Sequence, residues 1–279
     1  MTAHPPPFVV APKGAAAAGQ RRYRMTVAYD GGPFAGWQVQ PDRPTIQGEL
    51  ESALQQLTGA PARVHASGRT DTGVHARGQV AHFDLARRVE PRRLLLGLNA
   101  VLPDSIRVTA LAAAPGAFHA RYSATGKEYR YFIWNGPQTP PWLRGWRTPM
   151  RDPLDVAAMR AAAAPLIGEH DFAAFSANPH REIEGTVRRL DELRLIRRGP
   201  ELTLIARGNG FLYRMVRSLA GFLIRVGQGA LPPESAVDIL ASRIRTARVP
   251  TAPPQGLFLW RVNYRGGGIS APAESAGGR

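Results

Sequence analysis

Short segments in which apolar and polar residues alternate occur in both halves of the chain, and they constrain the fold more than any other feature. Apolar residues occupy every second position over residues 23–29 and again over 129–133, as expected of strands with one buried face. Apolar residues recur at helical spacing over 46–57 and 212–226. Because strands and helices are mixed in both halves, we predict an α+β fold with helices packed against a mainly antiparallel sheet.

Further segments complete these two halves. We predict additional strands at residues 63–66, 79–85, 106–111, 187–197, 201–207 and 257–264, and additional helices at 91–100, 154–167 and 234–244. Residues 21–120 are predicted to form an N-terminal α+β half, and residues 121–265 a C-terminal one. The N-terminal extension, residues 1–20, and the Gly-, Ser- and Ala-rich tail, residues 266–279, are expected to be disordered.

The charge of the chain indicates a polyanionic partner. Its 36 basic residues outnumber its 21 acidic ones, which gives a formal net charge of +15, and a positive field of this size attracts nucleic acid. A high-GC genome would explain the preference for arginine over lysine, but it would not explain the excess of basic over acidic residues. Nucleic acid is therefore favoured over a membrane surface.

The composition also excludes several kinds of site. The chain has no cysteine, so it has no disulfide, thiolate zinc site or cysteine nucleophile. Its seven histidines show no metal-ligand spacing, and we expect neither a metal nor another cofactor. No apolar run is long enough to span a bilayer, and prolines interrupt the N-terminus where a signal peptide needs an apolar core. We therefore expect a cytoplasmic protein.

The most unusual segment is the polar, glycine-containing loop at residues 67–78. It places Asp71 between Gly68 and Gly73, two residues after Arg69. One interpretation is a turn in which Asp71 caps a helix or hydrogen-bonds its own backbone, which is common for an Asp-x-Gly sequence. The other is a functional loop in which the glycines let a ligand approach the backbone closely. The Asp-x-Gly pattern alone favours the simple turn.

The wider sequence favours the functional loop. The segment Gly68-Arg69-Thr70-Asp71-Thr72-Gly73-Val74-His75-Ala76 resembles the active-site loop of the bacterial tRNA pseudouridine synthase A family. Other segments of the chain resemble further motifs of the family. In chain order they are Tyr29-Asp30-Gly31 with Phe34-x-Gly36-Trp37-Gln38, Thr45-Ile46-Gln47, Phe118-His119-Ala120-Arg121-Tyr122-Ser123-Ala124, Gly168-x-His170-Asp171-Phe172, Phe211-Leu212-Tyr213-x-Met215-Val216-Arg217 and Pro254-Gln255-Gly256-Leu257. The resemblance covers about residues 21–265, and the agreement of several separate motifs makes it specific.

The resemblance implies the pseudouridine synthase fold, in which two α+β halves flank a central catalytic cleft, and it implies an isomerase. Asp71 corresponds to the catalytic nucleophile, and Arg217 to the basic residue that pairs with it. Aspartate is ionised at neutral pH and needs no base for activation, and a charge-assisted bond to a guanidinium contributes about 1.5–3 kcal/mol. The carboxylate can attack ribose C1′ or abstract the neighbouring proton to give a glycal; both routes remain open.

The resemblance also implies two substrate-binding residues and the partners. Tyr129 corresponds to the aromatic residue that packs against the target uracil, although its place in an alternating strand is also typical of core packing. Arg69 is the loop arginine and is expected to contact phosphate or fill the space left by a flipped base. The implied substrate is uridine at tRNA positions 38–40, in the anticodon stem-loop, and the implied assembly is a homodimer that holds the tRNA.

Some neighbouring features have simpler interpretations or depart from the family. Arg214 and Ser218 lie near Arg217, at positions where the family often has asparagine or histidine. Adjacent arginines such as Arg188-Arg189 are compatible with an RNA path, but each pair by itself is interpreted as solvated surface. Four tryptophans are interpreted as packing residues and not as stacking platforms: Trp37, Trp142, Trp146 and Trp260.

Two alternative functions belong to other classes. An RNA-binding protein without catalysis would not need Asp71, Tyr129 and Arg217 together, and all three are present. A metal-dependent nuclease would need two or more clustered carboxylates, whereas the loop offers one. We therefore predict a synthase whose activity survives a chelator and is lost in Asp71→Ala.

Overall fold

The computed structural model describes residues 15–17, 19–177 and 185–265, so most of the extension and all of the tail that were predicted to be disordered lie outside the described residues. The strands are β1 (Arg21–Tyr29), β2 (His65–Ala66), β3 (His75–Leu85), β4 (Ile106–Ala113), β5 (Ala124–Asn135), β6 (Thr148–Met150), β7 (Gly168–Asp171), β8 (Val187–Arg198), β9 (Glu201–Gly208) and β10 (Leu257–Tyr264). In the described part of the chain they form one sheet in the order β4-β1-β3-β10-β5-β9-β8-β7, with β2 beside β3 and β6 beside β5.

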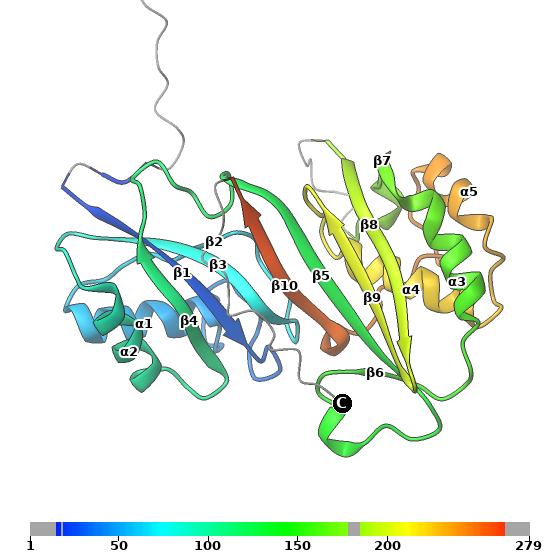
Figure 1. Ribbon diagram of the computed structural model, residues 1–279, viewed down its shortest axis with the longest axis horizontal. Helices are drawn as coiled ribbons and strands as arrows, with labels where there is room; N and C mark the ends of the chain where they lie inside the picture. The colour runs from blue at the N-terminus through cyan, green and yellow to red at the C-terminus, as the bar shows by residue number, and fades with distance from the viewer. Residues whose placement is uncertain (1–14, 18, 178–184, 266–279) are drawn as a thin grey trace, which may run out of the picture.

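Five α-helices accompany the sheet in the described residues: α1 (Ile46–Thr58), α2 (Pro91–Val101), α3 (Val156–Ala163), α4 (Met215–Gly227) and α5 (Ser235–Ser242). Figure 1 shows α1 and α2 at one end of the sheet and α3, α4 and α5 at the other. Each group of helices encloses its own hydrophobic core. The sheet pairs are mainly antiparallel, which confirms the predicted α+β class.

Local sequence signals explain why α1 forms where it does. The Thr45 side chain caps its first turn by accepting a hydrogen bond from the Gly48 backbone N–H, and Gly59 ends the helix in the left-handed conformation with φ of +75°. Leu50 and Leu54, on the predicted apolar stripe, are completely buried. Burial of each such side chain contributes about 1.5–3 kcal/mol.

The two cores meet at the junction of β3 and β10. These strands pair in parallel, with Phe258 opposite His75 and Leu259 opposite Ala76, and β10 pairs on its other side with β5. Leu259 is fully buried in the N-terminal core, although it comes near the end of the chain. The sheet is continuous across the halves predicted from the sequence, and the boundary between residues 120 and 121 stays a prediction.

Several predicted element bounds were wrong, for local reasons. The helix predicted from residue 212 begins at Met215, because Arg214 adopts a left-handed backbone conformation with φ of +57°. Residues 75–78, predicted as loop, form the start of β3. The helix predicted over 154–167 ends earlier and continues as a 3₁₀ turn that contains Pro165. None of the helices in the described parts of the chain is long and apolar enough to cross a membrane.

Candidate active site between the two cores

The loop that carries Asp71 lies between β2 and β3 and is held in place by the turn that follows β1. Gly36, with φ of +92°, lets the two backbones approach so closely that a Cβ there would lie 2.8 Å from the Thr70 carbonyl oxygen. The Trp37 backbone N–H donates a hydrogen bond of 3.0 Å to the same carbonyl. The Thr70 hydroxyl lies 2.9 Å from the Tyr29 hydroxyl. Two motifs far from Asp71 in sequence therefore fix its backbone.

The other end of the loop is tied to strands of both halves. The Ser67 hydroxyl donates to the Gln79 side chain at 2.7 Å, and the Gln79 amide donates to the Gly68 carbonyl at 2.8 Å. On β5, the Lys127 ammonium donates to the Ser67 carbonyl at 2.9 Å. These bonds leave the loop little freedom to move relative to β5.

Arg217 pairs with Asp71 at the N-terminal end of α4. Its Nη1 lies 2.8 Å from the Asp71 Oδ2, and its Nε donates to the Ala252 carbonyl at 2.8 Å. The Arg217 and Asp71 side chains are 11% and 21% exposed, so the pair is largely shielded from water and only weakly screened. The structure thus brings together the two residues predicted to form the catalytic pair; their catalytic roles stay predictions.

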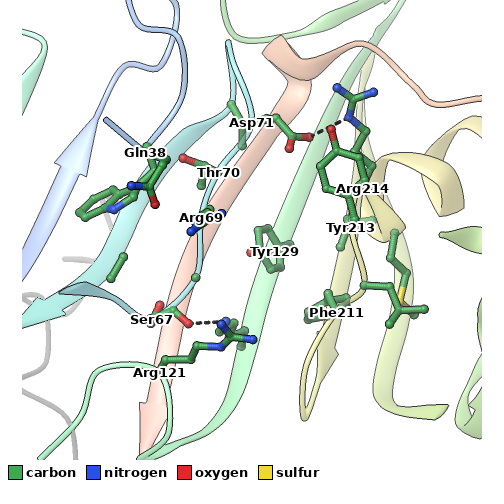
Figure 2. Close-up of a pocket in the computed structure, with 18 of the residues that line it drawn as sticks. Gln38, Ser67, Arg69, Thr70, Asp71, Arg121, Tyr129, Phe211, Tyr213 and Arg214 are labelled. Carbon is green, nitrogen blue, oxygen red and sulfur yellow. Dashed lines mark hydrogen bonds and ion pairs between the residues drawn. The ribbon is translucent and has the colours of Figure 1, made fainter. Parts of the chain in front are cut away.

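A second arginine, Arg214, also faces Asp71, and sequence reasoning noted it only as a departure from the family. Its Nε lies 3.5 Å from the Asp71 Oδ2, and its side chain is 39% exposed. Figure 2 shows the two side chains facing each other across the top of the cleft. Its guanidinium also lies over the Tyr213 ring, 4.8 Å from the centroid. Arg214 precedes α4 in a left-handed conformation, so helical spacing from Arg217 gave no signal for this contact.

Tyr129 lies on β5 in the middle of the cleft (Figure 2). Its ring packs edge-on against Phe211, with centroids 5.1 Å apart, and it touches both cores. Burial, followed by the neighbouring Tyr29 phenol and Asp71 carboxylate, raises the pKa of Tyr129 above its ordinary value. The phenol is therefore neutral at physiological pH and offers a flat aromatic surface beside the acid.

These residues surround a cleft of about 870 Å³. Arg69 is exposed and lines it, whereas Arg217 pairs with Asp71 but is not among the described lining residues. Arg188, interpreted from the sequence as solvated surface, also lines the cleft. Of the described lining residues only Asp71 is acidic, and the basic ones are Arg63, Arg69, Arg121, Lys127, Arg188 and Arg214. The cleft therefore presents one carboxylate in strongly positive surroundings.

Within the described parts of the chain, no group of three or more His, Cys, Asp or Glu side chains is placed to hold a metal ion. Among the cleft residues, the Asp71 carboxylate can act chemically either as a nucleophile or as a base that removes a proton. The basic lining residues are suited to binding phosphate groups.

Comparisons with known proteins agree with the resemblance seen in the sequence. A family model described as tRNA pseudouridine synthase matches residues 25–123 and 162–265. A tRNA pseudouridine synthase A from Halalkalibacterium halodurans is 47% identical over 248 residues, which are 88% of this chain and 94% of that protein. One from Bradyrhizobium diazoefficiens is 45% identical over 246 residues, 87% of this chain and 99% of that protein. The crystal structure of the archaeal box H/ACA sRNP Nop10-Cbf5 complex matches with a TM-score of 0.35 and 13% identity, over 72% of this chain and 43% of that one.

Proposed function

The chain belongs to the tRNA pseudouridine synthase family, and on this premise we propose that Asp71 starts the isomerisation of uridine to pseudouridine in the tRNA anticodon stem-loop, at the expected positions 38–40. As a member of the family, the protein is an isomerase that acts on tRNA. The observation that carries the role of Asp71 is its 2.8 Å ion pair with Arg217, in a basic cleft that contains no other described acidic residue.

The reaction breaks the bond between ribose C1′ and uracil N1 and forms one between C1′ and C5. C5 loses a proton and N1 gains one, so the composition is unchanged and no oxidant or reductant is needed. In one route the Asp71 carboxylate bonds to C1′ while uracil leaves; the uracil then turns, and its C5 displaces the carboxylate. In the other route the carboxylate removes the C2′ proton to give a glycal. Both routes need a charged carboxylate aimed at the ribose.

The geometry of Asp71 suits this task because its two oxygens have different surroundings. Arg217 and Arg214 both contact Oδ2, and among the described residues no side-chain hydrogen bond or ion pair engages Oδ1. Oδ1 is therefore available to the substrate while Oδ2 is held. The Ala252 carbonyl fixes Arg217 in turn, so the acid is oriented before the substrate arrives, and little reorganisation is needed during the reaction.

Tyr129 and Arg69 are proposed to hold the nucleotide after it leaves the RNA stack. Flipping a nucleotide costs a few kcal/mol, and stacking a base on an aromatic ring returns about 1–3 kcal/mol. The central position of Tyr129 supports the first role. The exposure of Arg69 at the cleft supports a contact with phosphate or the vacated space.

A turnover assay in the presence of EDTA tests the proposal. Unmodified tRNA is incubated with the protein, and pseudouridine is detected by chemical derivatisation, because the isomerisation leaves the mass unchanged. We expect pseudouridine to form with wild type and with Asp238→Asn, which changes an exposed acid on α5, and not with Asp71→Asn. RNA cleavage that requires metal would indicate the nuclease alternative, and binding without base change the non-catalytic one.

We further propose that the protein works in the cytoplasm as a homodimer that holds the tRNA, as the sequence resemblance implies. Sedimentation of the protein, alone and with tRNA, measures the assembly. A monomer that modifies tRNA at the full rate would contradict the dimer.

A further inference from the structure

The cleft has a second end, away from Asp71, where three cations gather. Arg121, Lys127 and Arg188 all line it. In Figure 2, Arg121 lies beside Ser67, with Tyr129 between this end and Asp71. No described carboxylate pairs with any of the three cations, and unneutralised cations on separate elements of one cleft are suited to an anion.

The electrostatics of these side chains show that they repel one another. Burial and then Arg121 lower the pKa of Lys127 to about 8. Burial and then Arg121 also lower the pKa of Arg188. Among the described residues, the side chains of Lys127 and Arg188 donate to neutral backbone carbonyls: Lys127 to Ser67 at 2.9 Å, and Arg188 to Val187 at 2.6 Å and to Gly185 at 3.2 Å. A bound phosphate would relieve this repulsion.

An exposed aromatic ring lies next to Arg121. The Tyr122 residue is 65% exposed, although it lines the cleft. Its ring rests on His119, with centroids 4.3 Å apart and planes inclined by 31°. His119 contacts His82 at 4.6 Å, and His82 stacks on His65 at 5.0 Å. Tyr122 is therefore the first of a row of contacting rings that includes the buried His82.

Backbone hydrogen bonds fix the two histidine rings that lie behind Tyr122. The His119 Nδ1 accepts the backbone N–H groups of Arg121 at 3.1 Å and Tyr122 at 3.2 Å. The His82 Nδ1 accepts the Ala120 N–H at 3.2 Å. A ring that is already positioned loses little conformational entropy when a ligand stacks on it. This separates Tyr122 from Trp142, which is more exposed, at 73%, but is not among the described cleft-lining residues.

We propose that Arg121, Lys127 and Arg188 bind one phosphate group of the RNA and that Tyr122 stacks on the base of the adjoining unpaired nucleotide. The inference rests on the proposed function, because Asp71 takes the target uridine and this second subsite takes a neighbour of it. The ligand class is a nucleotide in a single-stranded loop. Stacking recognises the π face that every base has, so the subsite is tolerant of sequence.

Binding of an anticodon stem-loop RNA to the full chain tests the base contact. All variants carry Asp71→Asn, so that affinity is measured without turnover. We expect Tyr122→Ala to raise Kd by about 5- to 150-fold, the equivalent of one lost base stack. The Kd of Tyr122→Phe should stay within about twofold of the parent because this variant keeps the ring. The control Trp142→Ala should leave Kd unchanged. An unchanged Kd for Tyr122→Ala would overturn the inference.

A single abasic nucleotide moved through the loop of the RNA locates the stacked base. At one position the abasic substitution should weaken binding to the parent protein and have no further effect in Tyr122→Ala. If the penalties of the two changes add at every position, the tyrosine does not contact a base.

Salt dependence tests whether the three cations share one phosphate. Each phosphate neutralised contributes about 0.7–0.9 to the slope of log K against log salt concentration. The variant Arg121→Gln/Lys127→Gln/Arg188→Gln should therefore lose about 0.7–0.9 of slope, and Arg243→Gln, an exposed arginine outside the cleft, should lose none. A loss of about 2–3 in slope would mean that the three cations bind three separate phosphates. That result would overturn the proposal of one shared phosphate, and so would an unchanged slope. If the triple variant does not fold, the double variant Arg121→Gln/Arg188→Gln replaces it, because it keeps the Lys127 bond to Ser67. Its slope of log K against log salt concentration should fall by no more than about 0.9. An unchanged Kd for this double variant would overturn the proposed phosphate site. Failure of the proposed function would look different: wild type would bind the RNA and form no pseudouridine.

Discussion

Replacing Gly36 with alanine tests how strictly the position of Asp71 limits the reaction. A Cβ at residue 36 would lie 2.8 Å from the Thr70 carbonyl oxygen and 3.1 Å from the Asp71 carbonyl carbon, whereas ordinary contacts begin at 3.4 Å. The Asp71 loop must therefore retreat by about 0.6 Å, the difference between 3.4 and 2.8 Å. Both atoms belong to backbone, so no side-chain rotation can relieve the contact.

Two effects follow, and they differ in size. The left-handed backbone of residue 36, with φ of +92°, costs an alanine roughly 1–2 kcal/mol of folding free energy. A misplacement of about 1 Å can cost about 100-fold in rate, so a shift of about 0.6 Å should lower the single-turnover rate about 10-fold or more. The Kd for tRNA should barely change, because Gly36 is not among the described cleft-lining residues.

The matched control is Gly59→Ala, at the end of α1. Gly59 has φ of +75° with nothing within 4 Å of a built Cβ, so alanine there has a similar backbone strain without the contact. Single-turnover rates at saturating tRNA and urea unfolding of both variants separate strain from displacement. A wild-type rate for Gly36→Ala, or an equally slow reaction in Gly59→Ala, would show that displacement of the Asp71 loop does not limit the rate.

Three further predictions concern charged groups. Arg217→Gln should lower the unfolding free energy by about 1.5–3 kcal/mol, the value of a charge-assisted bond, and should slow single turnover. If urea unfolding and the single-turnover rate both match wild type, the ion pair with Asp71 neither stabilises the fold nor supports the reaction. Burial and Arg121 lower the pKa of Lys127 to about 8, so Lys127 loses its charge as pH rises from 7 to 9. RNA affinity should therefore fall over that range in wild type and stay level in Lys127→Gln. Equal pH profiles of the two proteins in a filter-binding assay would contradict this. Burial above all, and then nearby cations, lower the pKa of His82 from 6.5 to about 3; the unfolded chain therefore binds a proton that the folded one refuses, and the unfolding free energy falls below pH 6.5 by at most about 1.4 kcal/mol per pH unit for this group. His82→Asn should reduce that fall when urea curves at pH 7 and pH 5 are compared, and an unaltered difference between the two curves would exclude this role.

Much of the fold followed from local patterns. The caps and apolar stripe of α1 lie within one short segment, so Thr45, Leu50 and Gly59 could be interpreted without knowing what they pack against. The same locality explains the errors. No local signal marks Arg214 as left-handed, since arginine has no preference for that conformation. Residues 75–78 show no apolar alternation, and the pairing of His75 and Ala76 with β10 is visible only in the folded chain.

The candidate site divides in the same way. A single acid, Asp71, in a glycine-containing loop of a strongly basic chain could be read directly from the amino-acid sequence, and the sequence motifs indicated Arg217 as its partner. The contact between these two residues, 146 positions apart in sequence, became visible in the folded chain. So did the approach of Arg214 to the same oxygen and the position of Arg121, Lys127 and Arg188 on one cleft. The physical reason is that periodicity specifies an element and its buried face, whereas the meeting of distant side chains depends on how two separate cores join across β3 and β10.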